Sequence, residues 1–287
     1  MTDSMRGRVC LVTGATSGIG KTTAHALAAM GASVVLIGRD PQKGEATAQE
    51  IREDTGNEEV ELLRADLSSQ TSIRELAEHV LAEHDRLHVL VNCAGAFFRD
   101  RRVTIDGLEM TFALNHLAYF LLTTRLLHLL QESAPARIVN VTSGAHSRGR
   151  IDFEDLQGER RYRGQAAYNQ SKLANVLFTY ELARRLDRTG VTANCVHPGV
   201  VHTNFGRQNQ PLAWRLMIAI VAPFMHSLEK GAETVVYLSS DPKVETVTGK
   251  YFHDLKPKRS SKLSYDEAVA ARLWQVSEEL TARPRTG

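Results

Sequence analysis

The sequence has few cysteines and almost no net charge. Its three cysteines, Cys10, Cys93 and Cys195, are far apart and form no CxxC pair. This spacing argues against a disulfide framework and against a cysteine zinc site, and it fits a reducing cytoplasm. The 35 Lys and Arg residues against 33 Asp and Glu residues leave a net charge of +2, so no nucleic-acid partner is expected.

Long apolar runs are also absent. The most apolar stretch, residues 214–225, contains Arg215 and Pro223 and falls short of the roughly 20 residues that span a bilayer. We therefore expect no transmembrane segment, and this stretch is interpreted as a buried helix or an apolar lid. The first residues, MTDSMRGRVCLVTG, carry an early acid and do not match a signal peptide. A cytoplasmic protein is expected.

Histidine is present, but not in a pattern typical of a metal site. His84 and His88 are four residues apart, yet Asp85 and Arg86 between them are typical of a turn from helix to strand. The spacing would then not place both rings on one helix face. No metal is expected.

What the sequence does have is a regular alternation of short apolar runs with longer helical patterns. The apolar runs are nearly continuous in Val, Ile, Leu and Cys, as in strands covered on both faces of a parallel sheet. This alternation predicts one doubly wound α/β domain over residues 1–287, whose ligands bind beyond the carboxyl ends of the strands. The expected strands are 8–14, 33–38, 59–66, 87–95, 136–143, 191–199 and 250–253, and the expected helices are 19–30, 41–54, 71–84, 104–130, 165–186 and 229–239.

A glycine-rich loop follows the first expected strand. Gly14, Gly18 and Gly20 in TGATSGIG give the spacing GxxxGxG, not the common GxGxxG. Glycines allow a tight turn, and the N-terminus of the next helix offers free N–H groups to a pyrophosphate. The loop therefore predicts a dinucleotide site, and the alternative is a glycine-rich turn without a ligand.

The end of the second strand bears on the choice of dinucleotide. Asp40 lies twenty residues after Gly20, where an acid often binds a ribose hydroxyl, but it precedes Pro41 and is better explained as a helix cap. Arg39 follows Gly38, and a guanidinium suits a 2′-phosphate. NADP(H) is therefore predicted, with NAD(H) as the alternative if Arg39 points to solvent.

The stretch AAYNQSKLAN places Tyr168 and Lys172 one helical turn apart, about 5–6 Å at Cβ. Such a pair is either an ordinary polar stripe or a phenol whose pKa is lowered by an ammonium.

Taken together, the motifs resemble those of the short-chain dehydrogenase/reductase family. They are TGATSGIG, NCAG, the Asn115 motif FALNHLAYFLLT, the Ser143 motif IVNVTSGA, YNQSK and HPGVVHT, in the family's order along most of the chain. The resemblance implies that Tyr168 is the acid/base, with its phenolate favoured by Lys172. It also implies that Ser143 binds the substrate oxygen, that Lys172 holds the nicotinamide ribose, and that Asn115 supports the proton path to Lys172. Taken singly, each could be an ordinary structural residue.

The same resemblance implies a set of cofactor contacts. Asp66 would contact the adenine amine, although it is also explained as a turn acid, and Cys93 replaces the family's second Asn with only a packing change expected. His197 is interpreted as structural. The other implied contacts are Gly14, Ser17, Gly18, Ile19 and Gly20 around the pyrophosphate, Leu67 beside Asp66, Asn92, Ala94, Gly95, Tyr168 and Lys172 along the cofactor, and Pro198, Gly199, Val201 and Thr203 near the nicotinamide.

Two further segments indicate a branch of the family. An insertion at about 144–167 separates Ser143 from Tyr168, and a lid is expected at about 200–228. With SKLANVLFTYELARRL and the C-terminal tail, they are similar to the retinol-dehydrogenase-like branch, which implies lipophilic alcohol, aldehyde or ketone substrates. The basic KPKRSSK is interpreted as a solvated loop, with a membrane-surface contact as the alternative.

Two other functions remain open at this point. One is a non-catalytic NADP(H) sensor or scaffold on the same fold. The other is a double-bond reductase of the protochlorophyllide reductase type, which shares the Tyr–Lys pair. A homodimer through the helix at 165–186 would be typical of the family, unless the insertion blocks it.

Overall fold

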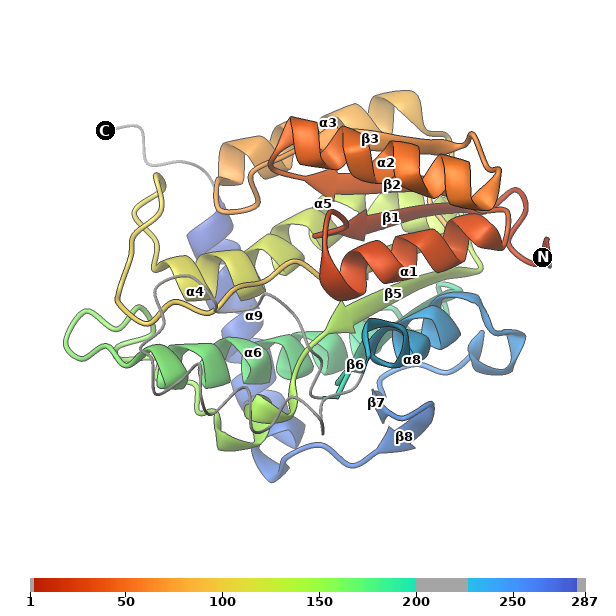
Figure 1. Ribbon diagram of the computed structural model, residues 1–287. Helices are drawn as coiled ribbons and strands as arrows, with labels where there is room; N and C mark the ends of the chain where they lie inside the picture. Colours follow the sequence, from red (N-terminus) through yellow and green to blue (C-terminus); the bar gives the residue numbers. More distant parts are fainter. Residues whose placement is uncertain (1–2, 200–226, 283–287) are drawn as a thin grey trace.

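The computed structural model describes residues 3–199 and 227–282, and these residues form one α/β unit around an eight-stranded sheet (Figure 1). The strand order is β3-β2-β1-β4-β5-β6-β7-β8, parallel except for the antiparallel pair β7–β8. The order reverses between β1 and β4, which opens a crevice at the carboxyl ends of these strands. The predicted doubly wound sheet is confirmed. Its strands are β1 (Val9–Thr13), β2 (Ser33–Gly38), β3 (Val60–Arg64), β4 (Val89–Asn92), β5 (Ala136–Val141), β6 (Val191–Val196), β7 (Tyr251–His253) and β8 (Lys256–Lys258).

Helices cover both faces of the sheet (Figure 1). Helices α3, α5 and α6 pack on one face, with α9 lying over α6, and α1, α2 and α8 pack on the other. Short helical turns lie at the ends of several strands and helices. The bounds are α1 (Gly18–Ala29), α2 (Pro41–Thr55), α3 (Gln70–Glu83), α4 (Met110–Phe112), η1 (Ala113–Leu117), α5 (Ala118–Glu132), η2 (Gly144–Arg148), α6 (Gly164–Arg185), α8 (Leu228–Ser240), η4 (Pro242–Val244), η5 (Lys262–Tyr265) and α9 (Glu267–Thr281).

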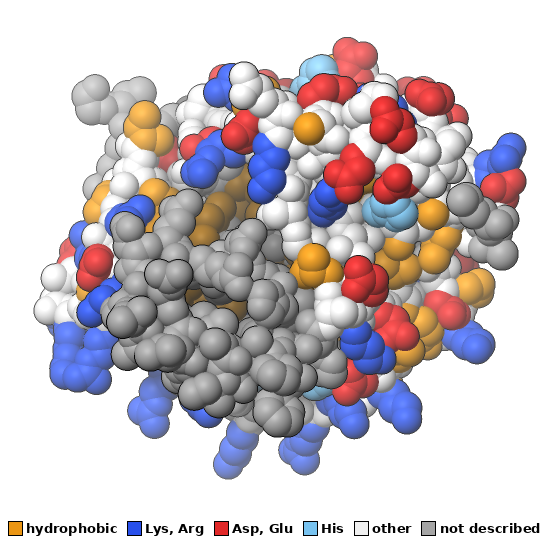
Figure 2. All heavy atoms as spheres, in the orientation of Figure 1, with side chains coloured by type: hydrophobic (Ala, Val, Ile, Leu, Met, Phe, Trp, Pro, Cys, Tyr) orange, Lys and Arg blue, Asp and Glu red, His pale blue; other side chains and the backbone are white. Residues whose placement is uncertain are grey.

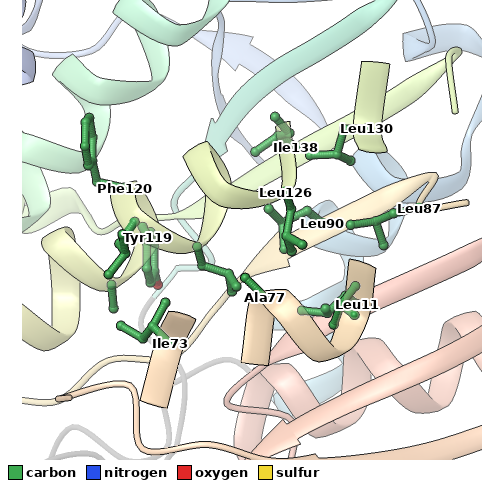
Figure 3. Close-up of a cluster of buried hydrophobic side chains, with 14 of the residues drawn as sticks. Leu11, Ile73, Ala77, Leu87, Leu90, Tyr119, Phe120, Leu126, Leu130 and Ile138 are labelled. Carbon is green, nitrogen blue, oxygen red and sulfur yellow. The ribbon is translucent and has the colours of Figure 1, made fainter. Parts of the chain in front are cut away.

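The two-sided cover explains the apolar character of the strands. In β1, Leu11 faces the core under α3 and α5, whereas its neighbours Cys10 and Val12 face the core under α1 and α8. Figure 3 shows Leu11 and Leu90 beside Ala77 of α3 and Leu126 of α5. A strand buried on both faces shows no alternation of polar and apolar residues, as the sequence pattern indicated.

The region before Tyr168 differs from expectation in two places. The helix predicted from residue 104 begins only at Met110, because residues 103–109 form a small hairpin closed by the bridge Val103–Glu109. The helix is also interrupted by the π-turn η1. The expected insertion ends at Arg163, since Gly164 already begins α6.

The C-terminal region contains two elements that were not predicted. Helix α9 buries Ala270, Leu273, Trp274 and Ser277, a helical spacing that was present in the sequence. Part of the basic KPKRSSK segment is the exposed edge strand β8 rather than a loop. Figure 2 shows Lys and Arg side chains along the lower margin of the molecule, where β8 lies in Figure 1.

The apolar stretch at 214–225 and almost all of the expected lid lie outside the described residues, and only Ser227 and Leu228 of the lid are seen, at the start of α8. Within residues 3–199 and 227–282, no helix combines the length and the apolarity needed to cross a bilayer.

Candidate active site

The glycine loop brings the ends of β1 and β4 into close contact. Gly14 has φ +67°, and a Cβ added to it would lie 2.9 Å from the Cα of Ala94. A Cβ on Gly20 would lie only 2.4 Å from the carbonyl oxygen of Gly14. Both positions therefore require glycine. The close approach places Gly14 and Ala94, two of the predicted cofactor residues, side by side at the crevice.

Thr13, which sequence reasoning missed, locks this contact. Its Oγ1 accepts hydrogen bonds from the backbone N–H groups of Cys93 (2.9 Å) and Ala94 (3.1 Å) and donates to the carbonyl of Val91 (3.3 Å). One buried hydroxyl thus joins β1 to the loop after β4. Its position directly before Gly14 was the available signal.

The start of α1 is suited to an anion. Ser17 is the N-cap, but its side chain makes no capping hydrogen bond, and the first turn contains no acidic residue. The N–H groups of this turn, which include those of Gly18 and Ile19, therefore lack the usual side-chain acceptor. Together with the tight glycine loop, this arrangement fits a pyrophosphate at the helix N-terminus.

The end of β2 confirms the interpretation of Asp40 as a helix cap. Its Oδ1 accepts the backbone N–H of Lys43 at 3.1 Å, and Pro41 occupies the first helical position. A Cβ on Gly38 would lie 2.5 Å from Cγ2 of Thr16, so any larger residue at this strand end would displace the Thr16 side chain of the loop. Arg39 is exposed beside them.

Asp66 and Leu67 follow β3. The Oδ1 atom of Asp66 accepts hydrogen bonds from the N–H (2.9 Å) and hydroxyl (2.7 Å) of Ser68, as expected of a turn acid. Leu67 is 8% exposed. The adenine contact of these residues stays a prediction.

The NCAG segment contributes structure as well as surface. Asn92 is fully buried, and its Nδ2 donates to Oγ1 of Thr123 (3.0 Å) and Oδ1 of Asn140 (2.9 Å). This amide nitrogen therefore ties β4 to β5 and α5, and it is not the atom that would line a cofactor. Burial raises the pKa of the Cys93 thiol to about 12, although the thiol lies close enough to Lys172 to interact with its charge.

The carboxyl end of β5 brings the predicted catalytic residues together. Ser143 follows β5, and its Oγ accepts the backbone N–H of Ala145 at 3.2 Å. The Ser143 hydroxyl also hydrogen-bonds the Tyr168 phenol. Lys172 is buried, with Nζ donating to the carbonyl of Val141 (3.3 Å) and lying 5.7 Å from the centre of the Tyr168 ring. The predicted juxtaposition of Ser143, Tyr168 and Lys172 is confirmed.

The pKa of Tyr168 shifts in the direction opposite to the one expected. Burial raises the pKa of Tyr168 to about 12, and the hydrogen bond from Ser143 offsets this only in part. Burial also lowers the pKa of Lys172 to about 8. Both shifts have the same physical cause, because a buried site disfavours the charged form of each group. At neutral pH, Tyr168 is therefore a neutral phenol able to donate a proton.

Asn115 lies in the π-turn η1 and holds the loop after β4. Its Oδ1 accepts the N–H of Ala96 (2.8 Å), and its Nδ2 donates to the carbonyl of Ala96 (2.9 Å) and to Oγ of Ser171 (3.1 Å). A Cβ on Gly95 would lie 3.1 Å from Oδ1 of Asn115 and 3.5 Å from Nζ of Lys172. Asn115 is therefore near Lys172, as predicted, and its part in a proton path stays a prediction.

Phe97 and the insertion border Tyr168; the insertion was predicted from the sequence, and Phe97 was not. The ring of Phe97 meets that of Tyr168 edge-on at 6.0 Å. In the insertion, the Tyr162 hydroxyl hydrogen-bonds the carbonyl of Phe98 (3.1 Å) and Oε1 of Glu109 (3.2 Å). The insertion therefore packs on the loop that carries Phe97 and Phe98.

The segment after β6 is only partly described. Pro198 and Gly199 lie at the strand end, where Nδ1 of His197 accepts the N–H of Gly199 at 3.3 Å, in line with a structural histidine. Val201 and Thr203 lie outside the described residues.

A metal site is not apparent in the part of the chain that the structure describes. No group of three or more His, Cys, Asp or Glu residues there is arranged to hold an ion. Helix α3 ends at Glu83, so His84 and His88 do not share a helix, as the sequence indicated.

This geometry defines a class of protein: a nucleotide-binding α/β oxidoreductase with a Ser–Tyr–Lys site at the switch point of its sheet. The chain belongs to the short chain dehydrogenase family, whose model matches residues 8–212.

Known proteins place the chain near a particular branch. It is 49% identical over 276 residues to retinol dehydrogenase 12 of Mus musculus, covering 96% of this chain and 86% of that protein. It is 46% identical over 283 residues to retinol dehydrogenase 11 of Homo sapiens, covering 99% and 88%. The resemblance to the retinol-dehydrogenase-like branch is confirmed.

Solved structures agree. The crystal structure of an uncharacterized protein from Mycobacterium paratuberculosis has a TM-score of 0.78 and 35% identity, covering 98% of this chain and 97% of that one. The Pseudomonas aeruginosa RhlG/NADP active-site complex has a TM-score of 0.71 and 28% identity, covering 87% and 95%. The protein is therefore a nicotinamide-dependent oxidoreductase that interconverts alcohols and carbonyl compounds.

Proposed function

We propose that this protein uses NADP(H) to interconvert lipophilic alcohols with their aldehydes or ketones, with Tyr168 as the acid/base. The observation that carries the proposal is the meeting of Ser143, Tyr168 and Lys172 at the end of β5, beside the glycine loop. The bound nicotinamide supplies the hydride donor or acceptor, and the protein supplies the proton and the orientation.

The three side chains have distinct tasks in carbonyl reduction. Tyr168, neutral at pH 7 because burial raises its pKa to about 12, donates its proton to the substrate oxygen. Ser143 accepts a hydrogen bond from Ala145, which leaves its own hydroxyl proton to donate to the same oxygen or to the phenolate. The Lys172 ammonium then stabilises the phenolate that remains.

The preference for NADP(H) rests on the end of β2. The Asp40 carboxylate caps α2 by accepting the N–H of Lys43. It is therefore not directed at the ribose, where an acid would repel a 2′-phosphate. Arg39 is the adjacent exposed cation. A guanidinium binds phosphate by two parallel hydrogen bonds, which favours the phosphorylated cofactor.

The preference for a lipophilic substrate rests on two observations. The Phe97 ring lies 6.0 Å from the Tyr168 ring, so an apolar aromatic group borders the acid/base. The similar proteins are named retinol dehydrogenases, and retinol is a lipophilic alcohol.

A substrate panel tests this proposal. Aliphatic, aromatic and isoprenoid aldehydes and ketones are assayed with NADPH and with NADH, and apolar carbonyls are expected to turn over fastest with NADPH. Turnover of small polar carbonyls alone would contradict the lipophilic assignment. NADPH binding without any turnover would indicate the sensor, and reduction of conjugated double bonds alone would indicate the other reductase class.

Tyr168→Phe removes the transferable proton while keeping the ring. We expect kcat to fall by at least about 100-fold, because general acid catalysis typically contributes that much. Tyr237→Phe on α8, which keeps the ring contact with Phe252 of β7, serves as the control and should keep the wild-type kcat. Retention of most activity by Tyr168→Phe would refute the acid/base role.

A further inference from the structure

His146 connects Ser143 to a distant part of the chain. It lies in η2, three residues after Ser143, and is 4% exposed. Its Nδ1 lies 2.8 Å from the carbonyl oxygen of Ser143, which also accepts the backbone N–H of His146 at 3.1 Å. On its other side, Nε2 lies 3.1 Å from the backbone nitrogen of Ser261.

These two partners define the protonation of the ring. A carbonyl oxygen can only accept a hydrogen bond, so Nδ1 must carry a proton and donate it to Ser143. A backbone N–H can only donate, so Nε2 must be bare and accept from Ser261. His146 is therefore the neutral Nδ1–H tautomer, and burial lowers its pKa in agreement with this state.

The far end of this connection is itself well anchored. The hydroxyl of Ser260 bonds those of Tyr180 on α6 and Ser264 in η5, each at 2.7 Å. The N–H of Ser260 donates to the Tyr265 hydroxyl at 3.1 Å, and the rings of Tyr180 and Tyr265 stack at 5.3 Å. The imidazole of His146 also packs on the Tyr251 ring, with 4.8 Å between the ring centres. The amide of Ser261 is thus a rigid support.

We propose that His146 is a positioning residue: its Nδ1–H holds the carbonyl of Ser143 so that the Ser143 hydroxyl faces the reacting oxygen, and the Ser261 N–H keeps the ring in the tautomer that donates there. This role rests on the proposed function of Ser143. The imidazole touches neither the Tyr168 phenol nor Lys172 among its described contacts, and it acts through Ser143 alone. Small displacements of such a donor reduce the rate of the chemical step far more than substrate binding.

Two isosteric substitutions separate the two ends of the connection. In His146→Asn, the amide nitrogen takes the place of Nδ1 and keeps the bond to Ser143, while the bond to Ser261 is lost. In His146→Gln, the longer side chain places its amide oxygen near the position of Nε2 and keeps the bond to Ser261, while the bond to Ser143 is lost. Both variants give up one hydrogen bond, so their melting temperatures should fall by similar amounts.

The first measurement compares kcat and the carbonyl KM of the two variants with those of wild type. We expect His146→Gln to lower kcat roughly 10-fold, with the carbonyl KM and the NADPH affinity unchanged, and His146→Asn to stay within about twofold of wild type. Equal kcat values in the two variants, or kcat values that simply follow melting temperature, would overturn the proposal.

A second readout does not depend on turnover. The ¹³Cζ resonance of Tyr168, measured by NMR at neutral pH with labelled tyrosine, reports the hydrogen bond between its phenol and Ser143. His146→Gln should shift this resonance and His146→Asn should not, and an unshifted resonance in His146→Gln would contradict the positioning role. A wild-type protein inactive on the whole panel would refute the proposed function, whereas this NMR comparison would still decide on His146.

Discussion

Burial and the hydrogen bond from Ser143 act in opposite directions on the pKa of Tyr168. The spacing to Lys172 indicated that the ammonium would lower the pKa of the phenol, but Tyr168 lies in a buried site and its pKa rises to about 12. Lys172 is buried as well, and its pKa falls to about 8. At the residue scale, burial decides the direction of both pKa shifts, because desolvation disfavours the phenolate and the ammonium alike.

The choice between NADP(H) and NAD(H) can be tested on two neighbouring residues. Arg39→Ala should raise the KM for NADPH about 10-fold or more and leave the KM for NADH within twofold, because the guanidinium would contact only the 2′-phosphate. Steady-state kinetics with both cofactors measure this.

Asp40→Ala is the matched control for Arg39→Ala. It removes the cap of α2, which accepts the N–H of Lys43, and should lower stability by about 1 kcal/mol without changing the cofactor preference. If Arg39→Ala affects both cofactors equally, or if wild type binds NADH more tightly, the assignment of Arg39 is wrong.

At the scale of single elements, α9 supports the π-turn that carries Asn115. Oγ of Ser277 lies 3.0 Å from Nε2 of His116, and Oδ1 of Asn175 on α6 lies 3.1 Å from its Nδ1. Nδ2 of Asn175 donates to the carbonyl of Asn115 at 2.8 Å. Three elements therefore meet at one buried histidine directly after a predicted catalytic residue.

This histidine makes stability depend on pH. Burial lowers the pKa of His116 to about 4 from an ordinary value of 6.5. Between these values the unfolded chain binds a proton that the folded chain does not, so stability is highest above pH 6.5 and falls toward pH 4. The loss is about 3 kcal/mol over this range.

Urea unfolding at several pH values between 7 and 4 measures this loss. His116→Gln should flatten the profile in part, because His88 and His146 also have lowered pKa values and still contribute. The exposed His79 on α3 offers a control, and His79→Gln should keep the wild-type profile. An identical acid loss in His116→Gln and wild type would exclude His116 as a source.

At the scale of the whole molecule, the C-terminal helix and the insertion cover α6. Every residue of α6 from Asn169 to Ala183 is buried. Trp274 of α9 packs on Phe178 of α6, with 5.7 Å between ring centres, and on Phe120 of α5 at 5.0 Å. From the insertion, the carbonyl of Leu156 accepts a hydrogen bond from the side chain of Gln170 at 3.0 Å. The helix considered for a family-type dimer is thus already packed within one chain.

We therefore expect that α6 does not mediate a dimer. Light scattering should give the same mass for wild type, for Arg184→Glu on α6 and for Glu53→Lys on α2, two exposed positions on different helices. A dimer that Arg184→Glu dissociates and Glu53→Lys does not would contradict this expectation.

Trp274→Ala tests how much the packing of α9 on α5 and α6 contributes to the free energy of unfolding. Because the indole is 7% exposed and packs on two other helices, its removal should lower the free energy of unfolding by about 3–5 kcal/mol. Denaturant titration measures this loss, and a change below 1 kcal/mol would mean that α9 is only loosely attached. Leu263→Ala, at a half-exposed position in η5, is a control with a small expected effect.

The sequence by itself determined the order of strands β1 to β7 and of the helices up to α8, the glycine loop, the cap at Asp40 and the spacing of Tyr168 and Lys172. These features depend on local periodicity and on residues a few positions apart, which a sequence states directly. The helical spacing of α9 is also present in the sequence.

Tertiary structure alone decided the rest. It half-buried Tyr168 and raised the pKa of its phenol against the expected direction, turned Asn92 into a tie between strands, and placed α9 over α6. It also brought Ser261 to His146, 115 positions away. Burial and contact depend on residues far apart in the chain, and no local pattern reports which of them will meet.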